Sequence, residues 1–127
     1  METRRSSPRR GPWTETTRTL IECLRCREVC EDTVTHALRV GGPAAEDDRL
    51  GALLDCADVC RTTATFIRRG SPLAGRTAGI AADLCERAAE ACASLAEDGP
   101  LAACAETCRR CAAWCRRLAA VNIERAA

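Results

Sequence analysis

Residues 104–115 read CAETCRRCAAWC, with cysteines separated by four, three and four positions. Residues at these separations lie on one face of an α-helix, and in a helical bundle that face is the buried one. Leucine usually occupies such positions, whereas cysteine takes all of them here. The stretch therefore predicts a helix whose core-facing stripe consists of thiols, contributed by Cys104, Cys108, Cys111 and Cys115.

The same pattern recurs in three further segments. CLRCREVC begins at residue 23, CADVC begins at residue 56, and residues 85–92 carry two cysteines seven positions apart. Leucine, valine, isoleucine and alanine extend these stripes at helical spacing. All eleven cysteines of the chain thus fall on predicted inward faces: Cys23, Cys26, Cys30, Cys56, Cys60, Cys85, Cys92, Cys104, Cys108, Cys111 and Cys115.

Glycine and proline divide the chain into four helical segments, which we expect at residues 14–40, 43–69, 71–97 and 98–120. Gly41, Gly42 and Gly70 stop the first two, while Ser-Pro at 71 and Asp-Gly-Pro at 98 supply an N-cap and a first-turn proline. Short connections between long helices favour antiparallel neighbours. We therefore expect an all-α fold, an antiparallel up-down four-helix bundle with a cysteine-lined core, over residues 13–127.

The composition supports a small helical domain. The 127 residues include two tryptophans, one phenylalanine and no tyrosine, so alanine, leucine and cysteine must fill the interior. The net charge of +1 argues against an electrostatic nucleic-acid partner. No segment reaches the roughly 20 apolar residues of a membrane span.

Residues 1–12 are rich in arginine, and we expect them to form a disordered basic tail. No apolar run follows these arginines, as a secretory or twin-arginine signal would require. We therefore expect a cytoplasmic protein without a membrane partner, in a compartment where thiols stay reduced.

The concentration of cysteines calls for a chemical explanation. Cysteine packs as a small buried hydrophobe, but that role does not require eleven inward-facing thiols. Disulfides fit poorly, because the count is odd and pairs three or four residues apart on one helix have strained geometry. Iron–sulfur centres use loop cysteines and zinc uses closed tetrahedral sets, and the spacing along each helix predicts neither. Pairs of sulfurs on rigid helices favour multiple Cu(I) ions, which are soft and do not demand four ligands.

The heights of the cysteines follow from the helical rise of ~1.5 Å per residue. Cys23 and Cys115 are expected at one end, and Cys104 and Cys92 at the other. A middle layer should contain Cys30, Cys56, Cys85 and Cys108. His36, the single histidine, comes out near the height of Cys92 and is a further candidate ligand.

With these motifs, residues 20–118 resemble the cysteine-rich four-helix-bundle copper storage proteins, relatives of which often carry a ferredoxin-like label. The resemblance implies a homotetramer of bundles, each holding many Cu(I) ions along its core without catalysis. It also implies a copper chaperone or copper enzyme as a delivery partner. The third helix lacks a C-x3-C pair here, so we expect a reduced capacity, on the order of ten Cu(I) ions at most.

Three other functions remain open from the sequence. The same scaffold suits a thiol redox or zinc-responsive regulator, or a specialised copper–thiolate enzyme. Against the enzyme stand the single histidine and the lack of an expected carboxylate–histidine constellation. The third alternative is a helical assembly protein that binds no metal.

Overall fold

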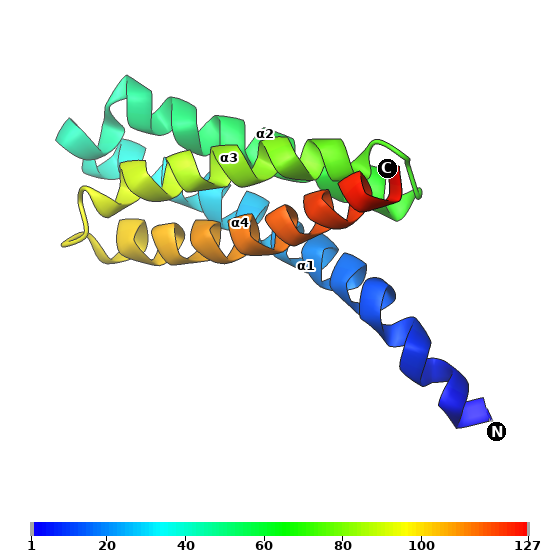
Figure 1. Cartoon of the computed structure of the whole chain (residues 1–127). Coiled ribbons are helices and arrows are strands. Elements are labelled where there is room, and N and C mark those ends of the chain that lie inside the picture. Colours follow the sequence, from blue (N-terminus) through cyan, green and yellow to red (C-terminus); the bar gives the residue numbers. More distant parts are fainter. Residues whose placement is uncertain (1, 127) are drawn as a thin grey trace.

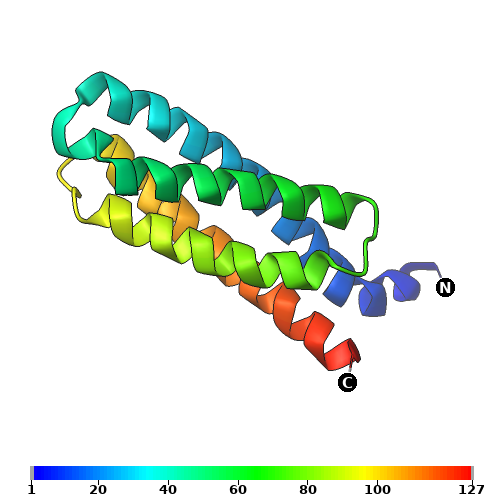
Figure 2. The ribbon, with the colours of Figure 1, turned by 90° about the horizontal axis from the view of Figure 1, so that it is seen from above.

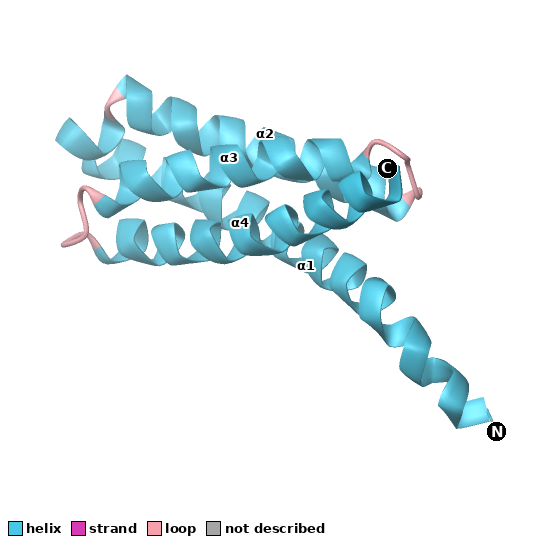
Figure 3. Ribbon diagram, viewed as in Figure 1, coloured by secondary structure: helices cyan, strands magenta, loops and turns pink. Residues whose placement is uncertain are grey.

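The computed structural model describes the backbone of residues 2–126 and the side chains of residues 15–121. The chain forms α1 (Glu2–Val40), a short 3₁₀ helix η1 (Gly42–Ala45), α2 (Asp47–Arg68), α3 (Ala74–Ala93) and α4 (Gly99–Ala126). Short loops join the helices, and the described residues include no strand (Figure 3). The expected all-α four-helix bundle is confirmed.

The four α-helices run alternately up and down around a common interior (Figures 1 and 2). Each packs on its neighbour in sequence, and α1 also packs on α4 to close the ring. The N-terminal turns of α1 continue past the ends of the other helices (Figure 1). No described helix has the combination of length and apolar character that crossing a bilayer requires.

The helix boundaries differ from the sequence expectation in several places. α1 begins at Glu2 instead of residue 14, and α4 runs on to Ala126 instead of ending near residue 120. The turn η1 precedes α2, which starts at Asp47 because two acidic residues there favour a helix N-terminus. α3 ends at Ala93, and turns carry the chain to α4. The expected tail at residues 1–12 lies outside the described side chains, so it stays a prediction.

Glycines allow the chain to turn after α1 and after α2. Gly41, Gly42 and Gly70 have φ angles of 75°, 58° and 65°, in the left-handed region that side chains disfavour. The Gly70 turn is closed by hydrogen bonds from the Gly70 amide to the Ile67 carbonyl and from the Ser71 amide to the Phe66 carbonyl. These bonds satisfy carbonyls at the end of α2 and turn the chain toward α3.

The expected cap at the start of α4 is present. The Leu101 amide donates to Asp98 Oδ1 at 3.0 Å, which satisfies one of the free amides of the first helical turn. Ser71 is placed differently from the expectation. Its hydroxyl accepts from the Leu73 amide at 3.1 Å, but α3 begins only at Ala74.

Small side chains fill the interior. Apart from the cysteines, the buried apolar residues are alanines with two leucines, Leu53 and Leu101. Alanine lets helix backbones approach closely, so the bundle needs no aromatic side chain to fill its centre. The expected interior of alanine, leucine and cysteine is confirmed for the described residues.

Arg49 of α2 links η1 to the C-terminal end of α3 by hydrogen bonds. This guanidinium is largely buried and donates to the Ala91 carbonyl at 2.8 Å, to Ser94 Oγ at 2.9 Å and to the Pro43 carbonyl. Ion pairs elsewhere, such as Arg87 with Asp55 at 3.3 Å, join helices on the exposed surface. Exposed pairs of this kind contribute little stability.

Candidate metal centre

All four helices contribute thiols to the interior. α1 supplies three cysteines, α2 and α3 supply two each, and α4 supplies four. Every one of them is fully buried and carries a free thiol. The structure therefore places each predicted cysteine on an inward face, as its helical spacing indicates: Cys23, Cys26, Cys30, Cys56, Cys60, Cys85, Cys92, Cys104, Cys108, Cys111 and Cys115.

The sulfur atoms of ten cysteines form an unbroken series of contacts along the bundle axis, which we call the thiol column. At one end, Cys115 lies 3.6 Å from Cys23 and 3.9 Å from Cys111, which continues to Cys60 at 3.8 Å. Cys60 leads to Cys85 at 3.7 Å.

From Cys85 the series continues through the middle of the bundle. Cys85 lies 3.5 Å from Cys56, and Cys56 lies 3.7 Å from Cys26. Cys26 is 3.9 Å from Cys108, which lies 3.9 Å from Cys104. Cys108 also meets Cys30 at 3.7 Å. These contacts agree with the expected positions of Cys23 and Cys115 at one end and of Cys104 beyond Cys108, and they do not include Cys92.

Three sets of sulfurs are compact enough to hold one metal ion each, with their ligand atoms within 4.8 Å of one another. Two sets have four members and one has three. The first four-thiol set is Cys26, Cys30, Cys56 and Cys108. The second is Cys26, Cys56, Cys60 and Cys85, and the three-thiol set is Cys23, Cys111 and Cys115.

The four-thiol sets overturn one step of the sequence argument. Spacing along single helices predicts no closed tetrahedral set, but the bundle assembles such sets from three helices at a time. A linear pattern cannot reveal them, because the members are separated by up to 82 positions.

Cys92 and Cys104 lie outside the three sets. Interaction with the Cys104 thiol, together with burial, raises the pKa of Cys92 well above the ordinary range. The opposite shift occurs at the centre of the column, where the Cys108, Cys111 and Cys30 thiols lower the pKa of Cys26 to about 7. The interior thus contains both thiols that stay protonated and at least one thiol that loses its proton readily.

The structure does not bring His36 into the three thiol sets. Its Nε2 lies 2.8 Å and 3.0 Å from the two carboxylate oxygens of Asp98, the residue that caps α4. A carboxylate–histidine constellation was not expected from the sequence, and the structure forms this one pair. The pair joins residues 62 positions apart, at the end of α1 and the start of α4, which only the folded topology brings together.

The sequence did not predict the burial of two charged residues near the thiol column. Glu22, next to Cys23, is 1% exposed, and its Oε2 accepts from Arg18 Nε at 3.2 Å. Its Oε1 has no hydrogen-bond partner among the described residues. Arg49 is the other residue, and its positive charge stabilises the thiolate form of Cys92. Both residues look like ordinary surface charges in the sequence, and only their burial distinguishes them.

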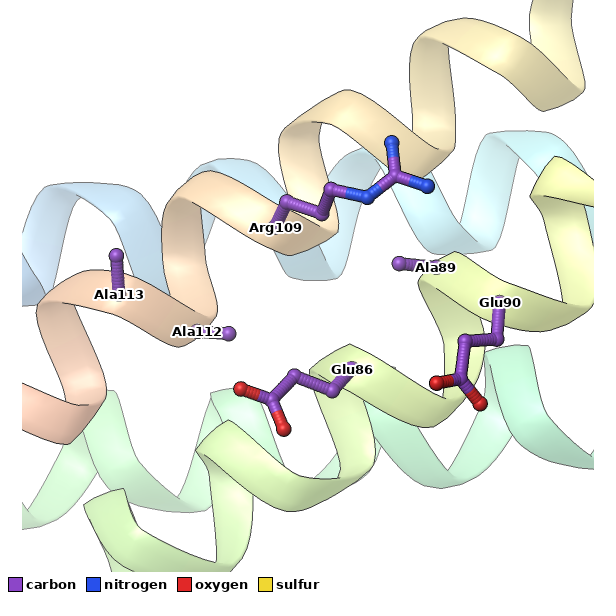
Figure 4. A pocket seen from close by; sticks show the side chains of 6 residues that line it. All are labelled: Glu86, Ala89, Glu90, Arg109, Ala112 and Ala113. Carbon is purple, nitrogen blue, oxygen red and sulfur yellow. The ribbon is translucent and has the colours of Figure 1, made fainter.

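A surface hollow of about 340 Å³ lies between α3 and α4, floored by alanines and flanked by Glu86, Glu90 and Arg109 (Figure 4). No cysteine lines it. The candidate metal centre is therefore the interior itself.

The fold and the thiol column define a class: a four-helix bundle whose core is built from soft metal ligands. The comparisons name the family. Residues 13–120 match the family described as Csp, copper storage protein, so the chain belongs to this family.

Two solved structures are similar to this chain. The Nmul_A1745 protein from Nitrosospira multiformis is 32% identical, with a TM-score of 0.81 over 85% of this chain and 97% of that one. A structure described as Cu(I)-bound copper storage protein BsCsp3 shares the fold, with 24% identity and a TM-score of 0.78 over 83% of this chain and 98% of that one. A search of curated proteins gave no match.

Proposed function

We propose that this protein binds several Cu(I) ions through the thiolates of its core and thereby stores or buffers copper. The observation that carries the proposal is the continuous series of sulfur contacts from Cys115 to Cys104, in which neighbouring sulfur atoms lie 3.5–3.9 Å apart. Thiolate sulfur is the ligand that monovalent copper prefers. Membership of the copper storage family supports the same function.

The column suits a store because the bundle can fold without metal. Neutral thiols pack as small apolar groups, whereas eleven buried thiolates without cations would be too costly. Each arriving Cu(I) displaces protons and brings a compensating positive charge. The same helices can therefore hold the empty and the loaded states.

The dimensions of the three-thiol set support binding of one ion. Its sulfur–sulfur distances are 3.6, 3.9 and 4.0 Å. A point equidistant from the three atoms lies roughly 2.2 Å from each, close to the about 2.3 Å of a metal–thiolate bond. Cu(I) accepts three-coordination, so this set binds it with little rearrangement.

We assign ligand roles to all eleven cysteines. Cys92 and Cys104 extend the column beyond the compact sets. The contact with Asp98 engages Nε2 of His36 and leaves Nδ1 for copper, so we propose His36 as a late ligand at that end of the bundle.

The remaining properties of the proposal rest on the resemblance and the sequence. We propose a homotetramer that acts in the cytoplasm without catalysing a reaction and passes Cu(I) to a chaperone or copper enzyme. Proximity of His36 and Asp98 does not favour an enzyme, because Asp98 is already engaged in capping α4.

Anaerobic Cu(I) titration of the reduced chain, followed by native mass spectrometry, tests the proposal. We expect several copper ions per chain, up to about ten, and a mass four times that of the monomer. A redox or zinc-responsive regulator would instead take up one or two copper ions. Saturation at that level would refute storage, whereas a monomer carrying many ions would refute only the tetramer.

A further inference from the structure

The two four-thiol sets share two of their members, Cys26 and Cys56. Together the sets therefore contain six cysteines, and all four helices contribute at least one. Cys30 and Cys108 complete the first set, and Cys60 and Cys85 complete the second. Two tetrahedra with a common edge have this arrangement of corners.

The distances fit tetrahedral sites. With metal–sulfur bonds of about 2.3 Å, the sulfurs of a tetrahedral thiolate site lie about 3.8 Å apart. The shared edge from Cys26 to Cys56 measures 3.7 Å. In the first set, Cys30 to Cys108 measures 3.7 Å and Cys26 to Cys108 measures 3.9 Å.

The second set has the same dimensions. Cys56 to Cys85 measures 3.5 Å, Cys60 to Cys85 measures 3.7 Å and Cys26 to Cys85 measures 4.0 Å. The remaining pairs of both sets lie within 4.8 Å, so rotation of a few side chains completes the geometry.

Such a pair of sites suits an ion that requires four sulfurs. Cu(I) has no such requirement, but divalent ions with a filled d shell, Zn²⁺ and Cd²⁺, bind thiolates tetrahedrally. We propose that the six central thiols also form a binuclear site for such divalent ions, in which Cys26 and Cys56 bridge the two metals. Cys30 and Cys108 complete one ion's coordination, and Cys60 and Cys85 complete the other's.

Because of its charge, this centre should bind divalent ions more weakly than the same thiols bind Cu(I). Binding two divalent ions releases the protons of six thiols and leaves a formal charge of about −2 in a buried site, which desolvation penalises. Cu(I) is softer, and every added Cu(I) brings charge of its own to the same sulfurs. We therefore expect Cu(I) to expel both divalent ions, so the two metals compete for these six residues.

Cadmium tests the proposal, because its NMR signal reports the number of sulfur ligands directly. The reduced full-length chain is titrated anaerobically with Cd²⁺ in the presence of a competing chelator. We expect two resonances at positions typical of four-sulfur coordination. Native mass spectrometry should show at least the two corresponding ions per chain, and the three-thiol set has room for one more. A single such resonance, or signals from sites with fewer sulfurs only, would overturn the binuclear site.

Variants locate the ions. Cys30→Ala removes a corner of the first set alone and should leave one four-sulfur resonance, whereas Cys26→Ala removes a shared corner and should abolish both. Cys92→Ala, equally buried but outside both sets, should retain both resonances. Circular dichroism verifies that each variant folds, and the wild-type spectrum decides the matter if one does not.

The outcome is separable from copper storage. A chain that takes up many Cu(I) ions but shows no four-sulfur cadmium resonance refutes this inference and leaves the proposed function intact. Addition of Cu(I) to the cadmium-loaded chain should release two Cd²⁺ per chain. Retention of the cadmium would contradict the expected competition.

Discussion

Cys56 of α2 and Cys85 of α3 hold their sulfur atoms 3.5 Å apart, the shortest thiol–thiol distance in the described part of the chain. Both side chains are fully buried. Bringing two helices together here creates a pair of soft ligands without any loop. The metal-binding capacity of this protein is thus a property of how its helices pack.

Single removals of thiols should therefore have unequal effects on copper capacity. Cys108 lies within 4.0 Å of Cys26, Cys30 and Cys104, whereas Cys92 belongs to no compact set. We expect Cys108→Ala to lose more Cu(I) per chain than Cys92→Ala, because it interrupts bridging among several thiolates. Native mass spectrometry after anaerobic loading measures the difference. Equal losses would show that the positions of the thiols do not matter.

Both substitutions should leave the metal-free bundle folded. Removing one buried sulfur costs about 1–2 kcal/mol through lost contacts and a small cavity. Urea denaturation of the reduced, metal-free variants checks this. Unfolding of either variant in buffer would contradict the view that thiols act as replaceable packing groups in the empty state.

Replacing glycine with alanine should have opposite effects on stability at Gly70 and at Gly51. Gly70→Ala should destabilise the chain by about 1 kcal/mol, because its φ angle of 65° is unfavourable for a residue with a Cβ atom. Gly51 lies within α2 with open space around it, so Gly51→Ala should stabilise the chain by about 0.5–1 kcal/mol. Denaturant midpoints measure both, and a shift of the same sign in both variants would contradict the assigned turn.

Arg49 should be far more important for stability than an exposed arginine. Arg49→Met removes the hydrogen bonds from the largely buried guanidinium to the Ala91 and Pro43 carbonyls and should cost about 2–3 kcal/mol. Arg87→Met removes an ion pair whose partners are both more than half exposed, and should cost less than about 1 kcal/mol. Equal denaturation midpoints for the two variants would show that the Arg49 contacts contribute nothing.

The pair of His36 and Asp98 predicts a dependence of stability on acid pH. Two hydrogen bonds lower the pKa of Asp98 below its ordinary value: the bond from His36 has the larger effect, and the bond from the Leu101 amide has the smaller one. Its contribution is therefore present above the unfolded carboxyl pKa of about 4 and is lost as pH falls through the lower folded value.

Thermal melts of the metal-free chain test this expectation. Asp98→Ala should lower the melting temperature most near neutral pH, and the gap to the wild type should shrink in strong acid. A gap that stays constant down to about pH 2 would exclude this origin of the effect.

The sequence is sufficient to predict the helices and the burial of every thiol, because a helical face is a local, periodic property. Cys104 to Cys115 can face only one way once residues 98–120 are helical. The capping role of Asp98 is local as well and was predicted correctly.

What the sequence could not predict depends on distances between helices. The four-thiol sets combine residues from three helices, and His36 meets Asp98 across 62 positions. Spacing along one helix contains no information on such contacts. Arg49 was missed for a similar reason, since its partners in η1 and at the end of α3 surround it only after folding.

X-ray absorption at the copper edge of the anaerobically loaded, reduced chain tests the central claim most directly. The account predicts a first shell made of sulfur alone, with a second copper atom at short range because thiolates of one column bridge successive ions. A first shell dominated by nitrogen or oxygen, or copper atoms with no metal neighbour at full loading, would contradict it.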